Sequence, residues 1–128
     1  MNINIFGSTG VIGKKTLSLI DNNFLNLKVN LLCAKSNLKL LTEQINKYKP
    51  KYAFLYDQEK FKKSERKIGK TKFLDLNELQ SYLLSSKSNL SLLAISGYKS
   101  LYFLESIIQN TDYLGLANKE SIVSAGHL

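Results

Sequence analysis

A run of seven residues near the start of the chain, GSTGVIG at 7–13, has a spacing suited to binding a phosphate group. Gly7, Gly10 and Gly13 stand three residues apart in a chain that has only 7 glycines. Gly7 can adopt the backbone angles of a tight turn, Gly10 lacks a Cβ that would keep a diphosphate from the main chain, and Gly13 lets a helix pack closely on a strand. The spacing is therefore a G-x-x-G-x-x-G variant of the dinucleotide-binding fingerprint, with a purely structural turn as the alternative.

A second stretch whose side chains could bind a ligand is the polar run Asn118-Lys119-Glu120, which lies between an apolar segment and the next predicted helix. An amide, an ammonium and a carboxylate side by side can together orient a sugar or a phosphate-bearing substrate. The spacing alone is equally compatible with an ordinary helix N-terminus, capped by Asn118 and with Glu120 favoured by the helix dipole.

Secondary-structure elements must position both stretches. The sequence predicts that strands and helices alternate along the chain. Apolar, partly β-branched runs predict strands, and apolar residues at helical spacing predict the helices between them. We expect strands at 2–6, 27–34, 52–56, 90–95 and 112–117; helices over 13–24, 38–48, 76–83 and 101–108; a loop or short helix within 57–72; and a further helix beginning in KESIVSAG at 119–126. Such alternation predicts a single α/β domain over 1–128, with a Rossmann-like, doubly wound, mostly parallel sheet and helices on both faces.

The end of the second predicted strand indicates which dinucleotide would bind. Proteins that bind NAD carry an Asp or Glu there to hold the ribose 2′-OH, but no acid occurs between Asp21 and Glu43. Lys35, Ser36 and Asn37 instead offer a cation and polar donors, which suit the 2′-phosphate of NADP(H). Ser36 or Asn37 could also cap the following helix, and the two roles are compatible.

Composition narrows the classes of partner. The net charge is +8, but Arg66 is the only arginine and the lysines are scattered, so we expect a solvated basic surface, or one that steers phosphorylated ligands, and no nucleic-acid site. The single cysteine, Cys33, excludes an internal disulfide and fits a reducing compartment. Without a membrane-spanning run or room for a signal peptide, the sequence predicts a cytoplasmic protein that binds no membrane.

Taken together, GSTGVIG and LANKESIVSAG resemble the 1-deoxy-D-xylulose 5-phosphate reductoisomerase family. The resemblance covers the whole chain, as that family's N-terminal NADPH-binding domain, and ANKES is its most specific part. It implies an enzyme of the non-mevalonate isoprenoid pathway that rearranges 1-deoxy-D-xylulose 5-phosphate and reduces the product with NADPH to 2-C-methyl-D-erythritol 4-phosphate. A divalent metal (Mg, Mn or Co) would chelate the phosphorylated sugar substrate, and the full-length enzyme is expected to be a homodimer.

The resemblance also assigns roles to individual residues. Thr9, Gly10, Val11 and Ile12 would line the cofactor diphosphate, Lys35, Ser36 and Asn37 would surround the 2′-phosphate, Asn118 and Glu120 would contact the cofactor, and Lys119 would contact the substrate.

This sequence also departs from the family. The family often has Ser where Val11 stands, Gly where Lys35 stands, and a second glycine where Ser100 stands. Its metal-binding carboxylates, mobile loop and C-terminal helices would lie beyond Leu128, so we expect no catalytic or metal-binding residue within this chain and no turnover by this chain alone.

Three other classes compete with this interpretation. A short-chain reductase or epimerase needs a Tyr-x-x-x-Lys pair, and Tyr56 and Lys60 fit that spacing but precede the fourth strand, too early for the role. A semialdehyde-type dehydrogenase needs a nucleophilic cysteine, whereas Cys33 falls inside a predicted strand. A non-enzymatic NADP(H)-sensing module is the third alternative. His127, the only histidine, has no acidic or cysteine cluster beside it and predicts no metal site.

Overall fold

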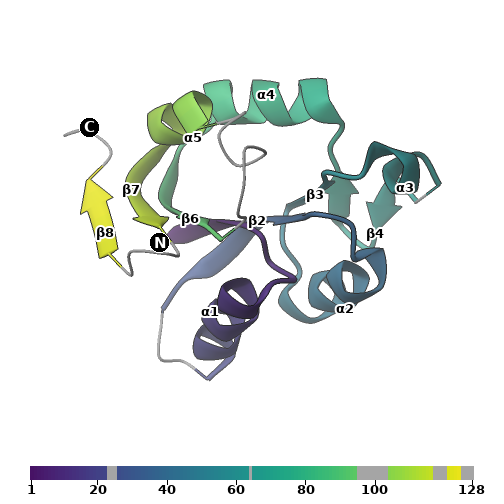
Figure 1. Cartoon of the computed structure of the whole chain (residues 1–128), viewed down its shortest axis with the longest axis horizontal. Coiled ribbons are helices and arrows are strands. Elements are labelled where there is room, and N and C mark those ends of the chain that lie inside the picture. The colour runs from purple at the N-terminus through teal and green to yellow at the C-terminus, as the bar shows by residue number, and fades with distance from the viewer. Residues whose placement is uncertain (23–25, 64, 95–103, 117–120, 125–128) are drawn as a thin grey trace.

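The computed structural model describes residues 1–22, 26–63, 65–94, 104–116 and 121–124. They form one central sheet with helices on both of its faces (Figure 1). The strands are β1 (Asn2–Phe6), β2 (Lys28–Ala34), β3 (Tyr52–Leu55), β4 (Lys67–Ile68), β5 (Thr71–Phe73), β6 (Ser88–Leu93), β7 (Thr111–Leu116) and β8 (Ser121–Ser124). The helices are α1 (Val11–Asp21), α2 (Leu38–Tyr48), α3 (Gln58–Lys63), α4 (Leu76–Ser85) and α5 (Leu104–Asn110).

The strand order confirms the doubly wound sheet predicted from the sequence. The order is β4-β5-β3-β2-β1-β6-β7-β8. The six strands from β5 to β7 in this order are parallel to one another, whereas the edge strands β4 and β8 pair antiparallel with β5 and β7. The chain winds from β1 through β2 and β3 in one direction, returns through α4 to β6, and then continues on the other side of β1. The winding therefore reverses between β1 and β6, and ligands of such sheets bind at the carboxyl ends of the strands at this point.

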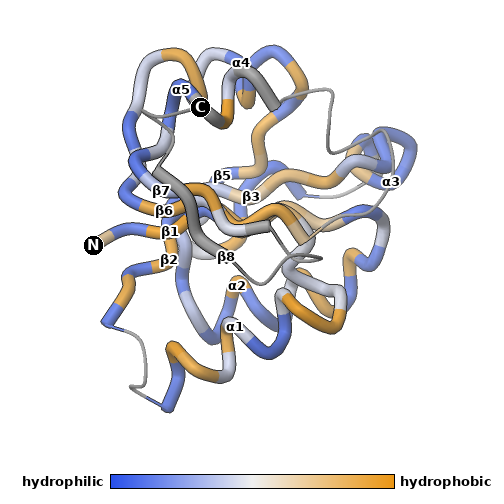
Figure 2. Tube along the Cα trace, turned by 60° about the vertical axis from the view of Figure 1, so that its left-hand side comes forward, coloured by the Kyte–Doolittle hydropathy of each residue, from blue (hydrophilic) through white to orange (hydrophobic). Residues whose placement is uncertain are grey.

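Two apolar layers hold the helices on the sheet. Helices α1 and α2 cover one face and α4 and α5 cover the other (Figure 1). Side chains alternate between these layers along each strand: Ile3 and Ile5 belong to the α1–α2 layer, while Phe6 belongs to the α4–α5 layer. Apolar positions accordingly follow the central strands, and the helices alternate between apolar and polar positions (Figure 2).

The α4–α5 layer also contains a buried polar network. Tyr82 Oη donates to Asn4 Oδ1 at 3.2 Å, and Asn4 Nδ2 donates to Asn110 Oδ1 at 3.2 Å. Asn30 Nδ2 in turn donates to Tyr82 Oη. Because buried amides are costly when unpaired, this network ties α4 and the end of α5 to the central strands.

Two local expectations were incomplete or wrong. A helix beginning in 119–126 is wrong over Ser121–Ser124, which forms the edge strand β8 paired antiparallel with β7. The β-branched pair Ile122-Val123 favours a strand, and β7 offers it a row of backbone partners. Within 57–72 the short helix is confirmed as α3, but the sequence did not predict β4 and β5, which are too short to show a periodicity.

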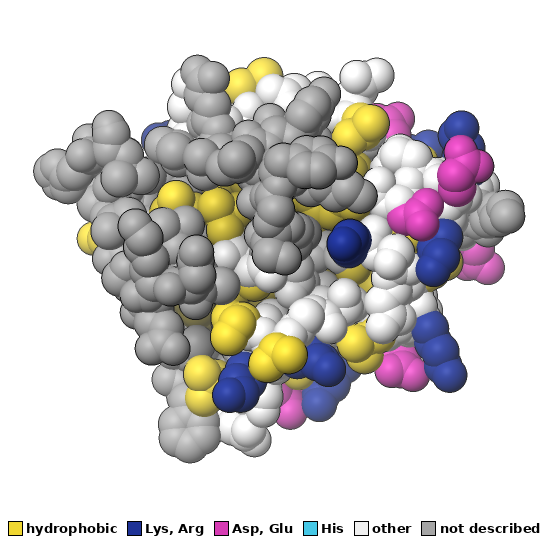
Figure 3. Space-filling view, viewed as in Figure 1, with side chains coloured by type: hydrophobic (Ala, Val, Ile, Leu, Met, Phe, Trp, Pro, Cys, Tyr) yellow, Lys and Arg dark blue, Asp and Glu magenta, His cyan; other side chains and the backbone are white. Residues whose placement is uncertain are grey.

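The helices in the described part of the chain are all too short or too polar to cross a bilayer. Basic and acidic side chains are interspersed over the side of the molecule that carries α2 and α3, on the face seen in Figure 3.

Candidate dinucleotide-binding site

The glycine-rich turn follows β1 at the carboxyl edge of the sheet. Gly7 has a φ of 109°, a left-handed conformation that favours glycine. The amides of Gly7 and Ser8 both donate to the carbonyl of Cys33 in β2, at 2.8 and 2.9 Å, and the amide of Gly10 donates back to the carbonyl of Gly7 at 3.2 Å. The turn is thus fastened to the neighbouring strand before the chain enters α1.

Gly13 allows α1 to lie directly on this turn. A Cβ at Gly13 would stand 2.1 Å from the Gly7 carbonyl oxygen and 2.7 Å from Ser8 Cα, distances at which real Cβ atoms are not found. A Cβ at Gly10 would meet nothing closer than the Gly7 oxygen at 3.6 Å, and this residue is exposed. Protein packing therefore requires glycine at position 13, whereas the open surface over Gly10 leaves room for a ligand to approach the backbone.

The N-terminus of α1 has no side-chain cap. Its N-cap is Gly10, no acidic residue stands in its first turn, and the first intrahelical bond runs from the amide of Lys14 to the carbonyl of Gly10 at 2.9 Å. By contrast, Asn37 caps α2, and Asp75 and Glu78 form a reciprocal capping box on α4. The positive end of α1 is therefore left for an anion from outside the helix.

Apolar side chains flank this helix end. Val11 is 67% exposed and Ile12 is 37% exposed, and Thr9 before them is partly buried. The four residues predicted to line a diphosphate are therefore contiguous at the carboxyl edge of the sheet and accessible from outside.

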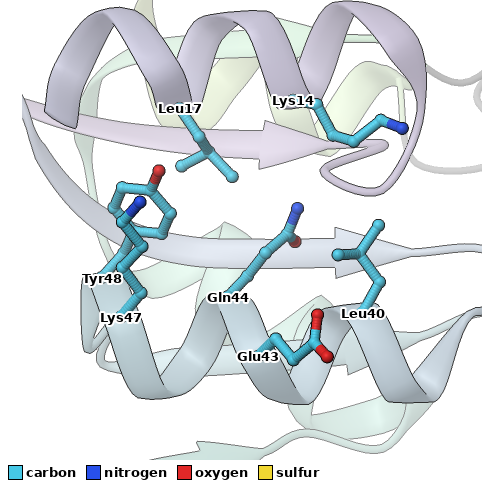
Figure 4. Close-up of a pocket in the computed structure, with 7 residues that line it drawn as sticks. All are labelled: Lys14, Leu17, Leu40, Glu43, Gln44, Lys47 and Tyr48. Atoms are coloured by element: carbon cyan, nitrogen blue, oxygen red, sulfur yellow. The ribbon is translucent and has the colours of Figure 1, made fainter. Parts of the chain in front are cut away.

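Gln44 of α2 forms a hydrogen bond with the glycine-rich turn. The sequence did not predict this contact. Its Nε2 donates to the carbonyl of Ser8 at 2.8 Å, and the side chain, which is 6% exposed, extends from α2 toward α1 (Figure 4). Among the described residues, neither Gln44 Oε1 nor the fully buried Ser8 Oγ has a hydrogen-bond partner. A polar residue next to Leu41 and Ile45 on the apolar stripe of α2 was the signal in the sequence.

The loop between β2 and α2 brings the second predicted group together. Asn37 Oδ1 accepts a hydrogen bond from the amide of Leu40 at 3.1 Å, so Asn37 rather than Ser36 caps α2, and Lys35 is exposed. The loop borders an open hollow of about 600 Å³ lined by Ser36, Asn37, Leu38, Lys39 and Lys60. Sequence reasoning did not place Lys39 or Lys60 at this loop.

A separate groove of about 220 Å³ lies between α1 and α2 (Figure 4). Its lining includes Lys14, Gln44 and Tyr48 but no residue of the glycine-rich turn or of the β2–α2 loop. This groove is therefore distinct from the predicted cofactor surface.

Comparison with known proteins decides among the classes that such a site allows. A sequence model of the 1-deoxy-D-xylulose 5-phosphate reductoisomerase family matches residues 3–126. The chain belongs to this family.

Individual proteins of this family are similar to the chain in sequence and in fold. The chain is 36% identical to a 1-deoxy-D-xylulose 5-phosphate reductoisomerase of Lachnoclostridium phytofermentans, over 98% of this chain and 33% of that protein. It is 36% identical to one of Helicobacter pylori strain J99, over 97% of this chain and 33% of that protein. The reductoisomerase of Zymomonas mobilis in complex with NADPH shares the fold with a TM-score of 0.77 and 25% identity, over 94% of this chain and 32% of that one. The chain thus spans about a third of the length of these relatives.

Membership of the reductoisomerase family agrees with the surroundings of Tyr56 and Cys33. Burial raises the pKa of the Tyr56 phenol, with a further contribution from Cys33, which is opposite to the lowered pKa that a reductase tyrosine needs. Lys60 donates a hydrogen bond to the carbonyl of Ser36. Cys33 is fully buried, and burial raises the pKa of its thiol, so it lies in the core as expected.

The remaining residues that the family resemblance singled out follow β7. This strand ends at Leu116, at the same edge of the sheet as the glycine-rich turn, because β1, β6 and β7 are parallel. Asn118, Lys119, Glu120 and His127 lie outside the described residues. Within the parts of the chain that the structure describes, no three His, Cys, Asp or Glu side chains gather as metal ligands.

Proposed function

We propose that this chain is the NADPH-binding part of a 1-deoxy-D-xylulose 5-phosphate reductoisomerase. The observation that carries the proposal is the uncapped N-terminus of α1 above a turn that packs without room for a Cβ at Gly13. The structure of the Zymomonas mobilis relative in complex with NADPH supports the choice of cofactor.

The residues present fit such a cofactor in two places. The diphosphate would lie over Thr9, Gly10, Val11 and Ile12, where free amides and the helix dipole favour negative charge. The 2′-phosphate would lie by Lys35, Ser36 and Asn37, where no acidic side chain of the β2–α2 loop opposes it. When bound, NADPH would supply a hydride to the carbonyl of the rearranged substrate.

In this proposal the chain's own residues bind and orient the cofactor. Gln44 and the Cys33 carbonyl hold the turn in shape, so the amides of α1 keep their direction before the diphosphate arrives. Such preorganisation reduces the free energy spent on ordering the loop when the ligand binds.

The whole enzyme would rearrange 1-deoxy-D-xylulose 5-phosphate and reduce it to 2-C-methyl-D-erythritol 4-phosphate with the help of Mg, Mn or Co. We further propose that Asn118 and Glu120 contact the cofactor, that Lys119 contacts the phosphorylated substrate, and that the whole enzyme is a cytoplasmic homodimer. Relatives described as complexes with magnesium, and with fosmidomycin and magnesium, fit this view. In a full-length enzyme carrying this domain, Lys119→Ala should raise KM for substrate more than Kd for NADPH; the reverse would contradict the substrate role.

A titration tests the cofactor assignment. NADPH and NADH are added to the chain and to its Ser36→Asp variant, and the two dissociation constants are measured by calorimetry. The aspartate should weaken NADPH by about tenfold through repulsion of the 2′-phosphate and should affect NADH much less. Equal losses for both cofactors would show that the loop does not hold the 2′-phosphate.

A further inference from the structure

The side chain of Lys60 contacts the β2–α2 loop, although Lys60 lies in a distant part of the sequence. Its Nζ lies 3.0 Å from the carbonyl oxygen of Ser36, although the two residues are 24 positions apart. Lys60 also lines the hollow that Ser36 and Asn37 border. The ammonium group therefore stands at the place where the proposed function puts the 2′-phosphate.

Neighbouring parallel strands position this lysine. The amide of Tyr56 donates to the carbonyl of Ala34 at 2.9 Å, and the amide of Asp57 donates to the carbonyl of Lys35 at 2.8 Å. The loops after β2 and β3 are thereby joined side by side. The helix that carries Lys60 begins directly after this junction.

A side-chain cap and a buried phenylalanine fix the start of α3. Asp57 Oδ1 accepts from the amides of Glu59 and Lys60, at 3.1 and 3.2 Å, and Phe61 is buried in the α1–α2 layer. The Cα of Lys60 is thus fixed between a capped helix start and a core side chain. Its long side chain is directed toward Ser36 rather than free to sample every direction.

Among the residues that the structure describes, no carboxylate forms an ion pair with Lys60. The ion pairs among the described residues join Lys47 to Asp21 and both Arg66 and Lys72 to Glu78, all elsewhere on the molecule. Lys60 donates to a neutral carbonyl, and its ammonium has three N–H donors, so it can keep this bond and still donate to a phosphate oxygen.

We infer that Lys60 is a specificity-determining residue that donates a charge-assisted hydrogen bond to the 2′-phosphate of NADPH. The inference rests on the proposed function and deepens it: the β2–α2 loop supplies the neutral donors Ser36 and Asn37 and the cation Lys35, and α3 adds a second cation, Lys60, that is held against this loop. Hydrogen bonds between ions are about twice as strong as neutral ones, which makes this lysine a main source of preference for NADPH over NADH.

The test compares Lys60→Gln with Lys62→Gln, an exposed lysine of the same helix whose removal changes the net charge equally. Dissociation constants are measured by calorimetry for NADPH, NADH, adenosine 2′,5′-bisphosphate and AMP. Lys60→Gln should weaken NADPH and the bisphosphate about tenfold and should change NADH and AMP less than about twofold. Lys62→Gln should leave the NADPH-to-NADH ratio unchanged, and Lys60→Arg should retain most of it.

Each result has a distinct meaning. If Lys60→Gln keeps the wild-type ratio, or shifts it no more than Lys62→Gln does, Lys60 is not the specificity residue and only this inference is overturned. If the wild-type chain binds neither NADPH nor the bisphosphate, the proposed function is overturned as well. Circular dichroism and melting temperature verify that the variants remain folded, as expected for exposed side chains.

Discussion

Replacing Gly13 by alanine tests whether the third glycine serves packing rather than ligand binding. The new Cβ would lie 2.1 Å from the Gly7 carbonyl oxygen, so α1 and the turn must separate by roughly 1.3 Å to reach an ordinary contact of 3.4 Å. The opposing atoms are backbone atoms, and the turn is fastened to β2 by two hydrogen bonds, so no side chain can swing aside.

The magnitude follows from two opposed terms. Overpacking of this kind costs about 1–3 kcal/mol, and here the rigid backbone favours the upper end. The higher helix propensity of alanine relative to glycine stabilises the folded state by up to about 1 kcal/mol and offsets part of this cost. The net loss of about 2 kcal/mol should lower the melting temperature of a 128-residue chain by roughly 8 °C.

Gly10→Ala is the matched control for this measurement. Its Cβ would meet no protein atom closer than 3.6 Å, and φ −81° with ψ 178° is accessible to alanine. Thermal melting followed by circular dichroism should place this variant within about 2 °C of the wild type, while calorimetry should show weakened NADPH binding. A Gly13→Ala protein that melts at the wild-type temperature, or a Gly10→Ala protein that loses as much stability, would refute the packing argument.

Three further changes have expected outcomes. A hydrogen bond from Lys72 is the main cause that lowers the pKa of Glu78 from 4.5 to about 2, so its stabilising effect is present above about pH 4.5 and is lost as pH falls toward 2. Glu78→Gln should therefore cost about 1 kcal/mol in urea unfolding at pH 7 and much less at pH 2.5, whereas the exposed Glu43→Gln should change little at either pH. Tyr82→Phe should lower the unfolding free energy by about 1–3 kcal/mol, because it leaves buried asparagine groups unpaired; an unchanged urea midpoint would contradict the network. Gln44→Leu should weaken NADPH and NADH equally, since it loosens the turn under the shared diphosphate; a loss for NADPH alone would contradict this role.

The sequence by itself determined the elements that lie along the chain and the general place of the site. Alternating apolar runs and helical stripes specified a parallel sheet, because a strand buried on both faces and a helix buried on one leave different local patterns. The spacing of Gly7 and Gly13 was equally informative, since a tight turn and a close helix contact each depend on one residue having no Cβ. The absence of acidic residues at the end of β2 indicated, from the sequence alone, a cofactor that carries a 2′-phosphate.

Tertiary structure alone decided which distant residues complete the site. Lys60 meets Ser36, and Gln44 meets the Ser8 carbonyl, because parallel strands bring the ends of successive β–α units to one edge of the sheet. No spacing in the sequence encodes these contacts, which depend on strand order and register. The same holds for β8, which pairs with the open edge of β7 where a helix was expected from the sequence.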